Sequence, residues 1–565
     1  MCGITALFSS NVQHKLVSSL KELQNRGYDS AGISYIDESG QIKNIKYAST
    51  KTLNAIDALN METPDNGVVG IGHTRWATHG AKETRNSHPH ISNDGRFHLV
   101  HNGIIENYNK LKEFLSGHGY IFKSETDTEV IVNLIQYYYN GKIKETLNKI
   151  NHILEGSWAI VVLYIEDNEP KLCGTKNGSP LLVGQNGMFV SEVSGFCNLT
   201  DTYGTIENYQ IIEITQDGFD NSRINFVNVE KTFNRNLEYP HWTLQEIYEQ
   251  AETSLKSVII DGRIDKNGKV ILEGLNLYEK YLTEVDNLIL VGCGTSFNAC
   301  LFSKYHFKPH FNSVQVINAS EFDIGDIPKL GETVMIFASQ SGETRDVYRC
   351  LEIAKNYGIF TIGVVNVRDS LITREVHCGC YINVGREVGV ASTKSFTGQI
   401  IVMYLMAAWF GKHNLKNFNL YDDIKNTIKF HEHVKTLVPL FDNCNSCFIL
   451  GKGQNYALAR EGALKIKEIS YIHAEAYELS ELKHGPFALL TDKTPVIIIG
   501  DDFIDNCYNE VKTRGSPVIV VDYKTFGGNS MTYVIILQLL AYELSIRREL
   551  DPDKPRNLAK VVTVS

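Results

Sequence analysis

The cysteine at position 2 is the first residue of this chain that could carry out nucleophilic chemistry. Methionine is normally removed before a small second residue, so we expect Cys2 to become the N-terminus. Its α-amine, with an ordinary pKa of about 7.7–8.0, can accept the thiol proton near neutral pH, and the thiolate can then attack an amide carbon. Taken alone, Cys2 also fits an ordinary buried cysteine, so the segments that follow it decide between the two interpretations.

Two hydroxyl-rich segments follow predicted strands and could bind a phosphate group. SQSGET at 339–344 follows the apolar run 334–337, and GTS at 294–296 follows the run 288–291. Hydroxyl and N–H groups at a strand-to-helix turn bind anions well, because the N-terminus of a helix carries partial positive charge. One such turn could be an ordinary helix cap, but two of them in a duplicated region favour phosphate binding.

A third group of reactive residues lies on one predicted helix. In EGALKIKE at 461–468, Glu461, Lys465 and Glu468 are spaced i, i+4, i+7 and share one face. The spacing by itself suits a row of surface ion pairs. The lone CNSC at 444–447 has no second cysteine pair at zinc spacing, and we expect neither a metal nor a cofactor.

The elements that position these residues fall into two contrasting halves. Residues 2–238 alternate strand patterns with helical stretches near 15–25 and 127–140, which indicates a mixed α+β domain. Residues 239–255 are predicted to be a linker that enters an amphipathic helix at about Thr243. Beyond it, short apolar runs alternate with helical patterns, which is typical of doubly wound parallel sheets.

The C-terminal half contains an internal repeat. LILVGCG at 288–294 is echoed by FILGKG at 448–453, and SEF at 320–322 by SEL at 480–482. Two tandem copies of one α/β fold are therefore expected, at 256–430 and 431–552, followed by a tail at 553–565.

Composition excludes several classes of function. The 565 residues are 43% hydrophobic and 21% charged with a net charge of -10, which predicts a folded protein that does not bind nucleic acid. The longest apolar run, 400–410, is too short to span a bilayer, and no secretory pattern is present, so we expect a cytoplasmic protein without membrane association. Eleven scattered cysteines predict that most of them are free thiols.

The N-terminal half contains a series of motifs in a fixed order. They are MCGI at the start, RGYDSAG at 26–32, HTRWATHG at 73–80, NSHPH at 86–90, HNGIIEN at 101–107 and SETDTE at 124–129. Together they resemble the motifs of class II glutamine amidotransferases, which have an N-terminal-nucleophile fold with four αββα layers. The resemblance implies that Cys2 is the nucleophile, and that Asn102 and Gly103 donate hydrogen bonds to the tetrahedral oxyanion within the glutamine pocket.

The same resemblance implies a glutamine pocket and a passage for ammonia. Arg75 would bind the substrate α-carboxylate and Asp127 its α-ammonium, because each needs a group of opposite charge. Thr78 and His79 would line the pocket. Trp76, next to Arg75, would be the gate of an internal ammonia channel.

The C-terminal motifs, including VASTK at 390–394, resemble the sugar isomerase (SIS) domain, a flavodoxin-like fold that binds phosphosugars. Joined to the amidotransferase domain, the tandem copies are similar over essentially the whole chain to the isomerising glutamine–fructose-6-phosphate aminotransferase family. The substrates would be L-glutamine and D-fructose 6-phosphate and the product glucosamine 6-phosphate, at the first step of UDP-N-acetylglucosamine synthesis. The implied sugar-phosphate ligands are Thr295, Ser296, Ser339, Gln340, Ser341, Thr344, Val390 and Ser392.

The second copy and the tail would carry the isomerase chemistry implied by this resemblance. Glu468 would move the proton between C1 and C2, with Lys465 beside it. His484, in ELKHGP at 481–486, corresponds to a ring-opening histidine that the family supplies across a dimer interface, so a homodimer is implied. Lys560, in DKPRNLAKVVTV at 553–564, would form an imine with the open-chain ketone, although a tail lysine is usually only solvated.

Two segments depart from the family pattern, and three alternatives stay open. HWTLQEIYEQ at 241–250 lacks the usual Met and Lys at its third and fifth places. The stretch 495–533 looks abbreviated, so we expect a reduced outer edge in the sheet of the second α/β copy.

The alternative functions are amide transfer to another acceptor, a non-catalytic sugar-phosphate sensor, and deamination of an amino sugar. VIVVDYKTFGG at 518–528 superficially resembles a phosphoribosyl-pyrophosphate loop but lacks its paired acidic residues.

Overall fold

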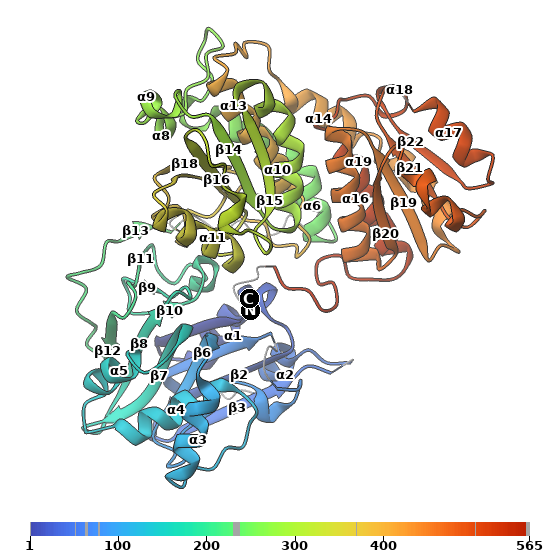
Figure 1. Ribbon diagram of the computed structural model, residues 1–565. Coiled ribbons are helices and arrows are strands. Elements are labelled where there is room, and N and C mark those ends of the chain that lie inside the picture. Colours follow the sequence, from blue (N-terminus) through green and yellow to red (C-terminus); the bar gives the residue numbers. More distant parts are fainter. Residues whose placement is uncertain are drawn as a thin grey trace. The chain divides into compact units, whose positions relative to one another are not determined.

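The computed structural model describes residues 2–50, 52–62, 66–76, 80–229, 238–368, 370–502 and 504–560 (Figure 1). The chain forms two compact units, whose main segments are Met1–Asn234 and Arg235–Lys560. In the described ranges no helix is long and apolar enough to cross a membrane. All eleven cysteines are free, as predicted.

The N-terminal unit contains two antiparallel sheets. Among the described residues, the strands of the first sheet follow the order β13 (Val227–Asn228), β11 (Thr202–Thr205), β9 (Leu182–Gly184), β10 (Phe189–Val190), β1 (Gly3–Phe8), β4 (Gly67–Arg75), β2 (Ser30–Asp37) and β3 (Ile42–Ala48). Those of the second follow the order β12 (Ile211–Ile214), β8 (Glu169–Asn177), β7 (Gly156–Glu166), β6 (His98–Ile105) and β5 (His90–Ile91).

Both faces of the second sheet are covered, and the sequence of β7 explains why. Its central part is an unbroken apolar run, and successive side chains of a strand point to opposite faces. Trp158, Ile160 and Val162 pack toward the outer helices, whereas Ala159 and Val161 pack toward the first sheet. The outer helices are α1 (Val12–Glu22) and α2 (Ala55–Glu62) on the first sheet, and α3 (Tyr108–Gly117), α4 (Asp127–Tyr138) and α5 (Ile143–Asn151) on the second. The four-layer αββα prediction is confirmed.

The first half of the C-terminal unit is a parallel sheet flanked by helices. Its described strands follow the order β15 (Ser313–Asn318), β14 (Asn287–Gly292), β16 (Thr333–Ser339), β17 (Phe360–Val365) and β18 (Cys378–Tyr381). This order, with the first strand between the second and the third, is flavodoxin-like, as predicted. Its helices include α8 (Glu273–Asn276), α9 (Glu279–Leu282), α10 (Gly294–Phe307), α11 (Arg345–Asn356), α12 (Leu371–Glu375) and α13 (Lys394–Phe410).

The second half repeats this topology, which confirms the predicted repeat. Gly294 (φ 53°) follows β14, and Gly453 (φ 63°) follows the equivalent strand β19, so both copies turn into a helix through a left-handed glycine. Within the described residues this sheet has no counterpart of β18, in agreement with the predicted reduced edge. The strand order is β20 (His473–Glu478), β19 (Ser446–Gly451), β21 (Val496–Ile499) and β22 (Val518–Val521), and the helices include α16 (Gln454–Ser470), α17 (Asp505–Lys512), α18 (Tyr523–Phe526) and α19 (Tyr533–Arg547).

The segment expected to link the halves contains two packed helices of the C-terminal unit. α6 (Trp242–Tyr248) begins beside the predicted start at Thr243, and α7 (Gln250–Ile259) follows it. Ile247 and Ala251 are buried in the same apolar cluster as residues of α13 and α19. The Asp553 carboxylate accepts the N–H groups of Trp242 (2.8 Å) and Thr243 (2.7 Å), and so caps α6 from the tail. The helices α14 (Leu420–Ile428) and α15 (His431–Leu437) join the two sheets.

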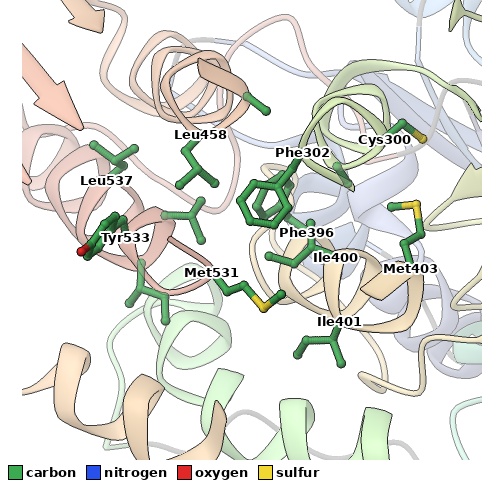
Figure 2. Packing of buried hydrophobic residues seen from close by; sticks show 14 of the residues in the cluster. Cys300, Phe302, Phe396, Ile400, Ile401, Met403, Leu458, Met531, Tyr533 and Leu537 are labelled. Atoms are coloured by element: carbon green, nitrogen blue, oxygen red, sulfur yellow. The ribbon is translucent and has the colours of Figure 1, made fainter. Parts of the chain in front are cut away.

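One apolar cluster is common to both sheets of the C-terminal unit. Figure 2 shows part of it, including Phe302 of α10, Phe396 of α13, Leu458 of α16 and Leu537 of α19. The helix α16 of the second copy packs on α10 of the first and on α19 of its own. Because the copies share this core, polar groups on α10 and α16 face each other in a fixed geometry.

Leu458→Ala is expected to destabilise the C-terminal unit by about 2–5 kcal/mol, because it leaves a cavity where a fully buried side chain packs. The matched control is Leu330→Ala: the Leu330 side chain is 86% exposed, so the substitution should cost less than about 0.5 kcal/mol. Urea unfolding followed by tryptophan fluorescence measures both variants. Equal unfolding midpoints would contradict the shared core.

Candidate active site

Cys2 lies immediately before β1, where this strand meets the end of β4. The antiparallel register pairs Gly3 with Thr74, so Cys2 is opposite the last residues of β4. The N–H of Trp76 points at the Cys2 sulfur, with an N···Sγ distance of 3.4 Å. The Cys2 sulfur also lies 3.7 Å from the Trp76 carbonyl oxygen, so the backbone of Trp76 holds the thiol at the end of β4.

Asn102, on β6, is oriented by two neighbours. Its Nδ2 donates to the carbonyl oxygen of Cys2 (2.8 Å), and its Oδ1 lies 3.1 Å from Nε2 of His73. The same His73 nitrogen lies 3.0 Å from the carbonyl oxygen of His101, which can only accept, so Nε2 carries the proton. Burial lowers the pKa of His73 to about 3, and the ring is a neutral donor. No role for His73 follows from the motifs, although it is the first residue of HTRWATHG.

Gly103 follows Asn102 in a conformation that excludes other residues. Its φ is 127°, and a Cβ at this position would lie 2.0 Å from the carbonyl oxygen of Ser157. The cause is the close antiparallel pairing of β6 with β7, in which Gly103 is opposite Trp158. Glycine is therefore required here by both the backbone angle and the available space.

Arg75 and Asp127 are both buried, as expected for residues that bind opposite charges. Arg75 is the last residue of β4, and Asp127 is the first of α4, where its Oδ2 accepts the N–H of Ile105 (3.0 Å). Burial lowers the pKa of Arg75, whereas the negative charges of Cys2, Asp29 and Asp127 act in the opposite direction. The guanidinium therefore lies within electrostatic reach of both Cys2 and Asp127.

The other predicted residues of this pocket are described only in part. Thr78 and His79 lie outside the described residues. Trp76 is half-buried, and its ring packs edge-on against Tyr28 with ring centres 5.5 Å apart. Lys82 Nζ lies 5.9 Å from the centre of the same ring. The indole is thus held at the end of β4 by a ring and a cation.

In the C-terminal unit, the hydroxyl-rich turn 339–344 lies between β16 and α11. Ser339 Oγ accepts the Gly342 N–H and lies 3.0 Å from Thr344 Oγ1. Ser341 is also buried, and the Gln340 carbonyl accepts two N–H groups from the segment that follows β17. The predicted hydroxyls therefore gather at the N-terminus of α11, a position that favours a phosphate group.

The second turn, at the start of α10, is bonded to both copies of the fold. Ser296 Oγ accepts a hydrogen bond from Gln399 Nε2 of α13 (2.9 Å). Thr295 Oγ1 lies 3.0 Å from Glu461 Oε1 and 3.1 Å from Lys465 Nζ, both on α16. The polar face of the second copy therefore meets the turn of the first.

The predicted face of α16 is a buried charge network, so the surface-stripe alternative is wrong. Lys465 Nζ lies 3.4 Å from Glu461 Oε1 and 2.5 Å from Glu468 Oε2. The side chains of Glu461 and Lys465 are 0% and 1% exposed. Burial would lower the pKa of Lys465, but the carboxylates of Glu461 and Glu468 outweigh it and raise that pKa above its ordinary value. Lys465 therefore stays charged and holds the Glu468 carboxylate.

The tail brings Lys560 to the segment that precedes α13. Its Nζ lies 2.5 Å from Glu387 Oε2 and 3.4 Å from Ser392 Oγ, and the Val390 N–H donates to the Asp553 carbonyl (3.3 Å). The Lys560 side chain is only 3% exposed, so a solvated tail lysine is excluded. No motif identifies Glu387, because its partner lies 173 positions away in the sequence.

His484 has no partner in this cluster. It is the last residue of the short helix η8 (Leu482–His484), and it is exposed. Its ring forms no hydrogen bond or ion pair in the described part of the chain. That a second copy of the chain uses His484 stays a prediction.

Known protein families match segments of both units of the chain. Residues 56–237 match the model of the glutamine amidotransferase domain family, and 281–408 and 440–527 match that of the SIS domain family. A probable glutamine–fructose-6-phosphate aminotransferase (isomerizing) of Acanthamoeba polyphaga mimivirus is 38% identical over 620 residues, covering 100% of each chain. The chain belongs to this aminotransferase family.

Two further relatives support the assignment. A family member from Caldanaerobacter subterraneus subsp. tengcongensis is 36% identical over 622 residues, covering 100% of each chain. A solved structure, the C-terminal domain of glucosamine-fructose-6-phosphate aminotransferase from Francisella tularensis, is 29% identical with a TM-score of 0.51, and covers 57% of this chain and 100% of that one. The full-length alignments exceed the 565 residues of this chain, so the relatives contain segments that it lacks.

Gly103→Ala is expected to destabilise the N-terminal unit by more than about 3 kcal/mol, since the new Cβ meets a backbone oxygen as well as an unfavourable φ. Gly95→Ala is the matched control: Gly95 also has a positive φ (78°), but a Cβ there meets nothing within 4 Å, so only the backbone cost of about 1 kcal/mol applies. Thermal unfolding distinguishes the two. A Gly103→Ala variant as stable as Gly95→Ala would refute the steric account.

Proposed function

We propose that the chain transfers the amide nitrogen of L-glutamine to D-fructose 6-phosphate and forms glucosamine 6-phosphate. The observation that carries this proposal is the full-length relationship to the aminotransferase family. Each unit also contains buried charged groups at its candidate site: Arg75 and Asp127 in the first, and Glu461 and Lys465 in the second. Neither a sensor nor a deaminase of amino sugars would need a reactive cysteine beside a buried arginine and aspartate.

In the N-terminal unit, glutamine would be bound by its charged ends. Arg75 would hold the α-carboxylate and Asp127 the α-ammonium, which is supported by their burial and opposite charge. The Cys2 thiolate would then attack the amide carbon, with its own α-amine as the base. Asn102 and Gly103 would stabilise the oxyanion. The thioester would be hydrolysed to glutamate, and ammonia would be released.

In the C-terminal unit, the hydroxyls of both turns would bind the sugar phosphate, with Val390 and Ser392 beside it. His484 of a second copy would open the ring, which is supported by its exposure and is the reason for proposing a homodimer. Lys560 would form an imine at C2, and ammonia would replace the lysine. Glu468, held by Lys465, would move the proton from C1 to C2 and so convert the ketose imine into an aldose amine.

Cys2→Ala should remove glutamine hydrolysis but leave the slow conversion of fructose 6-phosphate to glucose 6-phosphate, because the two chemistries use different units. Cys378→Ala, at a half-buried cysteine of β18, is the control and should retain both activities. Glutamate release and glucose 6-phosphate formation are measured separately. Loss of both activities in a folded Cys2→Ala variant would refute the separation, and wild-type protein that releases no glutamate would favour a sensor.

Trp76→Ala should uncouple the two reactions if the indole is the gate of an internal ammonia passage. Glutamate formation is then expected to exceed glucosamine 6-phosphate formation, because ammonia escapes into solvent. Trp76→Phe keeps an aromatic ring at this position and should stay close to one product per glutamate. A one-to-one ratio in Trp76→Ala would remove the proposed gate.

A further inference from the structure

The carboxylate of Glu387 is built into the segment before α13. Its side chain is 0% exposed. It accepts the Thr393 N–H (2.9 Å), the Ser395 N–H (3.0 Å) and the Ser395 hydroxyl (2.9 Å). These three bonds orient the group, and its Oε2 lies 2.5 Å from Lys560 Nζ. The tail lysine therefore ends on a carboxylate that the fold holds in place.

Other charged groups in this region are already engaged. Lys394 of α13 is paired with Glu249 (2.8 Å). Glu246 of α6 accepts the N–H groups of residues 388 and 389, and burial raises its pKa to about 8, so its carboxyl is mainly uncharged at neutral pH. Lys465 interacts with Glu387 electrostatically but is bonded to the carboxylates of α16. Lys560 is thus the cation in direct contact with the Glu387 carboxylate.

Imine formation places two demands on this site. An ammonium has no lone pair, so Lys560 must lose a proton before it attacks a ketone. The carbinolamine that results must receive a proton before its hydroxyl can leave as water. Because the Lys560 side chain is 3% exposed, bulk solvent is poorly placed to exchange these protons.

We propose that Glu387 is the acid–base partner of Lys560, taking the proton that activates the amine and returning it to the departing hydroxyl. This inference rests on the proposed function, in which Lys560 forms the imine. Glu387 touches the reacting nitrogen. The Ser392 hydroxyl, the other hydrogen-bond partner of Lys560 Nζ among the described residues (3.4 Å), carries no charge to accept a proton at neutral pH.

The proton balance closes with these groups. The ammonium of Lys560 gives one proton to the Glu387 carboxylate, and the neutral amine adds to C2. The carbonyl oxygen takes the second nitrogen proton and becomes a hydroxyl. The Glu387 carboxyl then protonates this hydroxyl, water leaves, and the nitrogen lone pair forms the C=N bond. The product is a protonated imine beside the Glu387 carboxylate, with the same net charge as the starting ion pair.

The charges around Glu387 favour its carboxylate both before the first proton transfer and after the last one. Burial tends to raise the pKa of Glu387, but the charge and the hydrogen bond of Lys560, together with the N–H groups of Thr393 and Ser395, outweigh it and lower that pKa to about 2. When Lys560 becomes neutral, its two contributions disappear, and the proton affinity of the buried carboxyl rises. When the cationic imine forms, the carboxylate is favoured again. The group therefore exchanges a proton with its partner and not with solvent.

The test is to trap the imine with borohydride in the full-length protein supplied with fructose 6-phosphate, at pH 6.5 to 8.5. In the wild type the adduct on Lys560 should form at a rate nearly independent of pH, because the proton moves within the pair. Glu387→Gln should slow adduct formation at pH 7 by about 100-fold or more. Its rate should then rise by up to about tenfold per pH unit, because solvent must deprotonate the lysine.

Three controls make the outcome decisive. Glu252→Gln removes an exposed carboxylate of α7 that forms no bond with Lys560 in the described part of the chain, and should leave trapping unchanged. Lys560→Arg defines the background, since arginine cannot form the imine. A cooperative urea-unfolding transition of the C-terminal unit in Glu387→Gln shows that this unit folds, because glutamine hydrolysis reports only on the N-terminal unit.

The outcomes separate the inference from the function on which it rests. A wild-type protein that makes glucosamine 6-phosphate without a trappable Lys560 adduct would refute the imine step itself. Wild-type trapping together with an equal rate and a flat pH profile in Glu387→Gln would overturn the role of Glu387. If Glu387 only anchored the tail, the apparent KM for the sugar would rise in Glu387→Gln without a new pH dependence, and the inference would again be wrong.

Discussion

The buried ammonium of Lys465, held between the carboxylates of Glu461 and Glu468, is the interaction on which the C-terminal site depends. Breaking a buried pair by removing one partner leaves an uncompensated charge, at a cost of about 3–5 kcal/mol. The same ammonium contacts Thr295 Oγ1, which belongs to the other copy of the fold. The Lys465 ammonium therefore bonds both the proposed phosphate-binding turn, at Thr295, and the proposed catalytic carboxylate of Glu468.

This charge network needs a rigid support, and the apolar cluster of the C-terminal unit provides it. Helices α10, α13, α16 and α19 contribute side chains to a common core, so the polar faces of α10 and α16 cannot shift independently. The C-terminal tail is also attached to the C-terminal unit at two places. Asp553 caps α6, and the Lys560 ammonium meets the Glu387 carboxylate. A segment that looks like a solvated terminus is thus bonded into the C-terminal unit.

The N-terminal site is built by strand pairing instead of helix packing. The register of β1 and β4 brings Cys2 to the Trp76 N–H, and a slip of one residue would turn every side chain of the strand to the opposite face. The neutral ring of His73 then fixes which end of the Asn102 amide faces Cys2. Backbone register and one buried histidine together determine the geometry of this site.

The sequence by itself determined the features that depend on local patterns, such as the repeat and the faces of single helices. The repeat is visible because each copy keeps a glycine after its first strand, Gly294 and Gly453, and the common face of Glu461, Lys465 and Glu468 follows from the helical period alone. The tertiary structure decided what depends on contacts between distant segments. Spacing could not tell a buried charge network from a surface stripe, because burial of α16 comes from α10 and α19. Nor could it find the pairing of Glu387 with Lys560, because that contact exists only when the folded tail returns to the segment between β18 and α13.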